Sequence, residues 1–230
     1  MKFLKKYINN IPLLALIVAN TIPLWGVLYL GWDAFHILVL YWAENIVVGF
    51  YNILKIAFLK VPRPIDNLGK VFIIPFFVVH FGGFMAGHGF FILLLFKRIK
   101  EPSIQGNEWP CFLVFIQLLL GVIKQAYSII PANMKYALAA LFVSHGISFV
   151  YNYLLKREFA LSKAERLMGE PYVRVAIMHF ALLAGGFFSA SIGQPIGILL
   201  VLVVLKIIID AKLHLREHRK KQKSKLAKQT

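Results

Sequence analysis

Long hydrophobic segments alternate with short polar or proline-containing stretches along most of the chain. Seven such segments can be separated, at residues 11–31, 33–60, 71–97, 111–130, 136–155, 172–190 and 196–218. A helix needs roughly 20 apolar residues to cross about 30 Å of hydrocarbon, and nearly all of the segments reach that length. The pattern therefore predicts an all-α, polytopic transmembrane bundle of seven helices within residues 1–218, followed by a basic tail at residues 219–230.

The third segment admits a second interpretation, because it contains two glycine-rich motifs, His80-Phe81-Gly82-Gly83 and Gly87-His88-Gly89. Glycine weakens a helix interior, so this segment can also be read as re-entrant, which leaves six crossings plus one re-entrant segment. In an unbroken helix the eight residues from His80 to His88 span about 12 Å. We therefore expect the two histidines to lie in different layers of the bundle.

The composition excludes a water-soluble domain. Hydrophobic residues make up 59% of the chain and charged residues 16%, so there are more apolar side chains than a soluble core of this length can bury. The formal net charge is +16, but residues 211–230 alone hold eight Lys or Arg against one acid, Glu217. We therefore expect membrane lipids, with anionic headgroups at the tail, as partners rather than nucleic acid.

The same basic tail predicts an orientation, because Lys and Arg collect on the cytoplasmic side of membrane proteins. We expect an integral protein of a prokaryotic cytoplasmic membrane, with its C-terminus in the cytoplasm. Seven crossings then place the loops at 97–100 and 156–171 on the cytoplasmic side and the N-terminus outside. Lys2, Lys5 and Lys6 conflict with that arrangement, and six crossings would relieve the conflict.

Glu44 is an acid that the pattern places near the middle of the bilayer. It lies 11 residues from both Asp33 and Lys55, or about 16 Å along a helix. An ionisable group is unfavourable at that depth without a partner. The carboxyl group is therefore either protonated or paired with Lys55 in a packing role, or it acts as a ligand or proton carrier.

Three of the later segments each present a polar or small-residue face at helical spacing. The faces are those of His145, Ser148 and Asn152, of Tyr172, Ala176, His179, Leu183 and Gly186, and of Lys206, Asp210 and His214. Counted from the cytoplasmic ends of their segments, one histidine or acid from each of five helices falls about 10 to 16 Å into the membrane. We therefore predict a metal site formed by His145, His179, Asp210 and His214, with Glu44 and His88 as proton-transfer residues.

Imidazole and carboxylate ligands suit zinc or another divalent transition metal, which would activate water against an ester or amide presented from the lipid. The first hypothesis is therefore a metal-dependent hydrolase of a lipid or amphiphilic substrate. A proton- or ion-coupled transporter using the same groups is the alternative from another class. Haem binding has less support, since histidine pairs at the usual haem spacing are missing. A purely structural bundle is a further alternative, and it requires only that the buried polar side chains pair with one another, as Lys206 could with Asp210. Whether the protein is an enzyme, and its oligomeric state, stay open at this point.

Five blocks of the sequence carry a resemblance to a known family: GWDAFHILVLYWAENIVVGFYNILK, VVHFGGFMAGHGFF, SHGISFVYNYL, RVAIMHFALLAGG and LVVLKIIIDAKLHLREH. Together they resemble a family of uncharacterised multi-pass membrane proteins known only as a domain of unknown function, which implies no activity, substrate or cofactor. The resemblance spans about residues 23–218. In layout, seven helices with histidines and an acid near the cytoplasmic side are similar to zinc-dependent membrane amidases of the alkaline ceramidase group. Where those enzymes have a two-histidine signature on the last helix, this chain has Asp210 and His214.

Overall fold

A computed structural model of the chain describes residues 25–26, 28–61, 67–99, 109–110, 113–160 and 162–192. Within these ranges the backbone forms helices and no strand. The contacts divide the chain into two compact units, Met1–Ala34 with Phe187–Thr230 and Phe35–Gly186. Nearly all of the described helical residues belong to the second unit.

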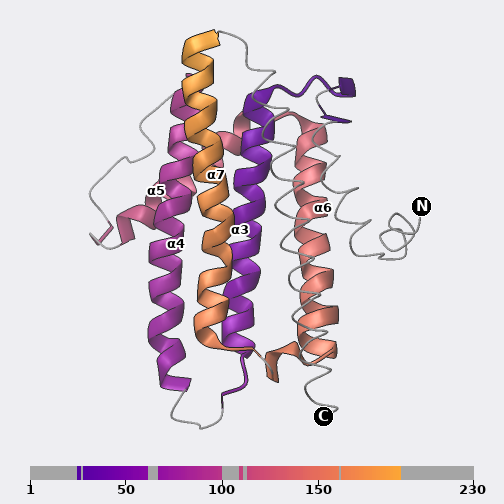
Figure 1. Cartoon of the computed structure of the whole chain (residues 1–230), viewed down its shortest axis with the longest axis vertical. Helices are drawn as coiled ribbons and strands as arrows, with labels where there is room; N and C mark the ends of the chain where they lie inside the picture. The colour runs from indigo at the N-terminus through magenta and orange to yellow at the C-terminus, as the bar shows by residue number, and fades with distance from the viewer. Residues whose placement is uncertain are drawn as a thin grey trace, which may run out of the picture. The chain divides into compact units, whose positions relative to one another are not determined.

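The described residues form five α-helices, and the long ones lie side by side (Figure 1). In chain order they are α3 (Ala34–Phe58), α4 (Asn67–Leu95), α5 (Val114–Ile129), α6 (Ala132–Ser148) and α7 (Ala164–Ile192), with a π-helix, η3 (Phe149–Leu155), continuing α6 and a 3-10 helix, η4 (Glu158–Ala160), before α7. Three stretches, Ala34–Phe58, Leu68–Leu95 and Ala132–Leu155, are long and apolar enough to cross a membrane. The all-α prediction is confirmed. The number seven is not, because segment 196–218, the tail at 219–230 and most of segment 11–31 lie outside the described residues.

α7 begins earlier than the hydrophobic pattern predicts. We expected a mixed-charge loop up to residue 171, but the helix already begins at Ala164 and contains Pro171. Its early turns carry an ion pair between Arg166 Nε and Glu170 Oε1 at 2.7 Å, with the i, i+4 spacing that supports an exposed helix. A hydropathy pattern does not record such a polar extension, so it places the boundary too late.

α3 holds three neighbouring helices through polar side chains that donate to backbone carbonyls. The indole N–H of the buried Trp42 donates to Met85 O of α4 at 2.7 Å. Tyr51 donates to a carbonyl of α6 at 3.0 Å, and the buried Asn52 donates to a carbonyl of α7 at 2.7 Å. These bonds satisfy donors that would be costly to leave unpaired in an apolar bundle.

α4 is one continuous helix over Asn67–Leu95, so the interpretation of the third segment as re-entrant is wrong. One of its glycines serves close packing instead, since a Cβ atom at Gly89 would lie 2.5 Å from the Trp42 ring. The chain leaves the helix where Lys97 adopts a left-handed conformation, with φ at 52°. Gly89 therefore lets α3 approach α4 closely, and none of the glycines interrupts the helix.

α5 runs in the same direction as α4, which the hydrophobic pattern does not predict. Phe115, at the start of α5, lies beside Gly83 in the middle of α4. Gln125, near the end of α5, donates to the carbonyl oxygen of Arg98, just beyond the end of α4, at 2.9 Å. Pro131 then leads directly into α6. The stretch between α4 and α6 therefore begins and ends near the same end of the bundle, whereas we expected the fourth segment to connect opposite ends.

Candidate functional site

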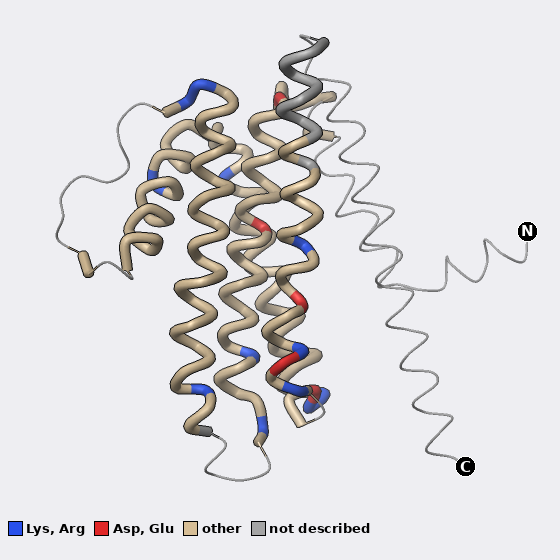
Figure 2. Tube along the Cα trace, turned by 60° about the vertical axis from the view of Figure 1, so that its left-hand side comes forward, with Lys and Arg blue, Asp and Glu red and all other residues tan. Residues whose placement is uncertain are grey.

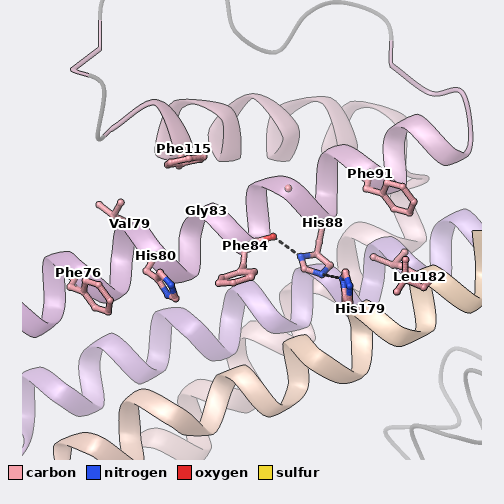
Figure 3. Close-up of a pocket in the computed structure, with 12 residues that line it drawn as sticks. Phe76, Val79, His80, Gly83, Phe84, His88, Phe91, Phe115, His179 and Leu182 are labelled. Carbon is pink, nitrogen blue, oxygen red and sulfur yellow. Dashed lines mark hydrogen bonds between the residues drawn. The ribbon is translucent and has the colours of Figure 1, made fainter.

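A cavity of about 630 Å³ lies between α4, α5 and α7 (Figure 3). Its walls are apolar and largely aromatic, and its main members are Phe76, Phe84, Phe91, Phe115 and Leu182. Three histidines interrupt these walls, at positions 80, 88 and 179. An apolar pocket of this size with a few convergent polar groups is the usual form of a small-molecule site.

The α4 wall of the cavity follows from the spacing of the sequence. A phenyl or imidazole ring recurs every three or four residues along one helical face, at Phe76, His80, Phe84, His88 and Phe91. Consecutive rings from Phe76 to His88 have centroids 5.1 to 6.4 Å apart. Gly87 leaves a gap in this wall, since a Cβ atom there would meet nothing within 4 Å. The cavity therefore owes part of its room to a missing side chain.

His88 of α4 and His179 of α7 point toward each other (Figure 3). His88 Nε2 and His179 Nδ1 are 3.2 Å apart, and His88 Nδ1 lies 2.7 Å from Phe84 O. A carbonyl oxygen only accepts, so His88 Nδ1 carries a proton, and in the neutral pair His88 Nε2 accepts from His179 Nδ1–H. His179 Nε2 is then the remaining acceptor of the pair. A proton taken up there can be relayed through His179 Nδ1 to His88 Nε2.

A second polar pair joins the same two helices at another level. His80 Nδ1 lies 2.7 Å from the Tyr172 hydroxyl oxygen. It is separated from the first pair by eight residues on α4 and seven on α7, or about 10 to 12 Å at the helical rise. The prediction that the two histidines of α4 lie in different layers is confirmed, and each has its own partner on α7.

Glu44 is paired with Arg174 of α7 and not with Lys55. Glu44 Oε1 and Arg174 Nη1 are 3.0 Å apart, and the two side chains are 15% and 33% exposed. The Nζ atom of Lys55 lies 6.0 Å from the centroid of the Tyr153 ring instead. The predicted Lys55 pairing is therefore wrong. Glu44 does not line the cavity that contains His88, and its role in proton transfer stays a prediction.

Arg174 and Tyr172 are site residues to which we assigned no role from the sequence. A signal for Arg174 exists, because it is the only charged residue between positions 172 and 190, and Glu44 is the only acid between positions 34 and 58. Two lone, opposite charges in apolar helices are expected to pair. Tyr172 shares the predicted face of His179, and that face does contact α4.

The other predicted metal ligands lie away from the His88–His179 pair or outside the described residues. His145 of α6 stacks on Tyr51 of α3, with ring centroids 6.4 Å apart, and does not line the cavity. Asp210 and His214 lie outside the described residues. In the part of the chain that the structure describes, no group of three or more His, Cys, Asp or Glu side chains is placed to hold a metal ion. The four-residue metal site stays a prediction.

A protein-family model described as a family of unknown function, DUF6498, matches residues 3–227. No curated protein and no solved structure matches the chain. The family match confirms the resemblance carried by the five sequence blocks, and it brings no activity with it.

Proposed function

The chain belongs to the family of unknown function DUF6498, and we propose that it is an integral membrane protein that binds a lipid-soluble or amphiphilic substrate and exchanges a proton with it. The main support for this proposal is the 3.2 Å contact between His88 Nε2 and His179 Nδ1 at the wall of the apolar cavity. Three helices long and apolar enough to cross a membrane support the location. A substrate would then enter this cavity from the lipid phase.

The His88–His179 pair is suited to general acid–base catalysis. The nucleophile is a water molecule or a hydroxyl group, whose oxygen attacks an ester or amide carbonyl while His179 Nε2 takes its proton. Transfer of a proton from His179 Nδ1 to His88 Nε2 places the positive charge on His88. The reverse transfer then returns a proton from His179 Nε2 to the leaving oxygen or nitrogen. Hydrolysis of a lipid or amphiphile is the reaction class that this arrangement favours, with His88 in its predicted proton-transfer role and His179 beside it.

A divalent transition metal on the same two histidines is a second candidate, because their nitrogen atoms have a suitable spacing. Two nitrogens bound to one tetrahedral ion at 2.0–2.1 Å are roughly 3.3 Å apart, close to the 3.2 Å between His88 Nε2 and His179 Nδ1. Such an ion would activate a water molecule for hydrolysis. Elemental analysis of protein purified without chelators tests this candidate: zinc that is present in the wild type and lost in His88→Ala and His179→Ala would support it. A metal-free wild type would exclude it.

We also propose six membrane crossings, formed by the segments at 11–31 and 196–218 together with α3, α4, α6 and α7. Figure 2 shows basic residues gathered toward the lower end of the bundle. The loops and helix ends joining α3 to α4 and α6 to α7 supply eight Lys or Arg, at positions 55, 60, 63, 70, 156, 157, 163 and 166. Between α4 and α6 there are five, at positions 97, 98, 100, 124 and 135. The positive-inside rule makes the first end cytoplasmic. Both termini then fall on that side, which removes the conflict of the N-terminal lysines.

Two glycines of α4 provide a matched test of the cavity. A Cβ atom at Gly87 or Gly69 would meet nothing within 4 Å, but only Gly87 lines the cavity. Lipophilic molecules retained by the protein in lipid nanodiscs are identified by mass spectrometry for the wild type, Gly87→Leu and Gly69→Leu. We expect a molecule that only Gly87→Leu loses, because leucine fills its space. Equal retention by all three proteins would contradict substrate binding in this cavity.

The chemical step is tested separately with His179→Gln. Glutamine keeps a polar side chain but cannot relay a proton between two ring nitrogens. We therefore expect His179→Gln to retain the molecule and to lose its conversion in membranes at least tenfold. Unchanged conversion would contradict the proton-exchange role of the pair.

A further inference from the structure

We infer that the substrate of this cavity has an uncharged polar head, such as a hydroxyl, carbonyl, ester or amide group, and that phosphate and carboxylate heads are rejected. This inference rests on the proposed function and narrows its substrate class. It would remove phospholipids and free fatty acids from the candidates, and it would leave neutral amphiphiles such as long-chain alcohols, acylglycerols and N-acylated lipids.

The charge of the cavity wall is the first argument. None of the described side chains that line the cavity is an acid, a lysine or an arginine. Arg174, the charge that α7 carries in its apolar part, is directed to α3, where it holds Glu44 at 3.0 Å. An anionic head that left water for this cavity would find no fixed counter-charge among the described lining residues, and burying such a charge unpaired is strongly unfavourable.

The histidines do not supply the missing positive charge in their observed arrangement. His88 donates from Nδ1 to a carbonyl oxygen at 2.7 Å, and its Nε2 lies 3.2 Å from a nitrogen of His179. His80 Nδ1 is engaged with the Tyr172 hydroxyl group. Each of these contacts can form between neutral groups, and the two pairs then provide acceptors and donors for a neutral head and no fixed positive charge for an anion.

The positions of the two polar pairs match an elongated molecule. Phe84 lies between them in the row of rings on the α4 wall, called here the α4 stripe. Its ring centroid is 5.2 Å from that of His80 and 6.4 Å from that of His88. A hydroxyl head would donate to His179 Nε2, and the apolar body would follow the stripe toward Phe76. The His80–Tyr172 pair, about 10 to 12 Å further along the helices, could then bond a second neutral polar group. The molecule would lie parallel to the helices, as a lipid chain does.

Two photoreactive probes that differ only in the head group test this inference. One is a long-chain alcohol and the other is the carboxylic acid of the same chain length, each with a diazirine at the same carbon, applied at pH 8 to the protein in nanodiscs. Peptide mapping locates the labelled residues. In the wild type and in Gly69→Leu we expect the alcohol to label α4 and α7 at least tenfold more than the acid. Gly87→Leu should lose the alcohol labelling of these helices.

Equal or stronger labelling by the acid would overturn the uncharged head, and alcohol labelling that persists in Gly87→Leu would overturn the cavity as its location. If Gly87→Leu does not fold, competition in the wild type decides the same question: unlabelled alcohol should displace the alcohol probe, and the unlabelled acid should not. The proposed function fails by a different result, namely unchanged conversion of the natural molecule by His179→Gln.

Discussion

Gly87 and Gly89 lie two positions apart on α4 and should respond oppositely to the same small substitution. A Cβ atom at Gly89 would lie 2.5 Å from the Trp42 ring and 2.6 Å from Val122, so Gly89→Ala overpacks the contacts with α3 and α5. We expect a loss of about 1–3 kcal/mol in the free energy of unfolding. Gly87→Ala enters open space and improves helix propensity, so it should be neutral or stabilising by up to about 1 kcal/mol. Thermal unfolding in detergent measures both variants.

Equal effects of the two alanines would show that α3 and α5 do not approach α4 at Gly89 as described. The comparison is internally controlled, because both variants change the same helix by the same atoms.

The Glu44–Arg174 ion pair should make a coupled contribution to stability. Removing one partner of a buried pair costs about 3–5 kcal/mol, and the one-third exposure of Arg174 reduces the expectation for Arg174→Gln to about 2 kcal/mol. The double variant Glu44→Gln/Arg174→Gln should then be more stable than the sum of the single effects predicts, with a coupling of about 1–3 kcal/mol. Additive effects in the double-mutant cycle would show that the two side chains do not interact energetically.

Among the elements, α5 provides the sharpest test, because its direction decides how often the chain crosses the membrane. If the stretch that contains α5 enters and leaves the membrane on the same side, cysteines replacing Lys97 and Lys135 should react with an impermeant reagent from that side of the membrane. Cysteines replacing Lys60 and Lys156 should then react from the opposite side. The labelling uses a Cys111→Ser background in sealed vesicles. Opposite sidedness of positions 97 and 135 would mean that α5 crosses.

Hydropathy alone predicts α3, α4 and α6 to within a few residues of their ends. Segments 33–60, 71–97 and 136–155 correspond to α3, to α4 and to α6 with η3. It fails to predict the direction of α5, because a 16-residue apolar helix and a crossing helix have similar patterns. The contacts of Phe115 with Gly83 and of Gln125 with Arg98 reveal that direction. Hydropathy also starts α7 too late, because the first turns of that helix are polar.

The partners of the site residues could not be predicted in the same way, since a hydrophobic pattern reports depth and face but not which helices adjoin. His88 and His179 were expected at similar depth, with different roles, because the loops at 97–100 and 156–171 were both placed on the cytoplasmic side; that placement is wrong, since these loops lie at opposite ends of the bundle. The structure brings them together because α4 and α7 run in the same direction with matching registers, as the His80–Tyr172 contact also shows. Lys55 was the wrong partner for Glu44 because the cation that reaches it comes from α7.

For the molecule as a whole, six crossings predict that both termini lie in the cytoplasm. Epitope tags at Met1 and Thr230 should both be cleaved by protease in inside-out vesicles and both be protected in right-side-out vesicles. The physical reason is that basic residues at both ends of the chain and in the loops joining α3 to α4 and α6 to α7 then share one side. Tags that are cleaved from opposite sides would restore an odd number of crossings.

The histidine pair is the centre of this account, and nitrogen-15 NMR of histidine-labelled protein in lipid bilayers tests it most directly. We predict a scalar coupling across the hydrogen bond between His88 Nε2 and His179 Nδ1, which His179→Gln abolishes. Addition of a long-chain alcohol should shift the His179 signals and leave those of His145 unchanged, because His145 lies outside the cavity. A wild-type spectrum without that coupling, or alcohol-induced shifts no larger at His179 than at His145, would contradict the account.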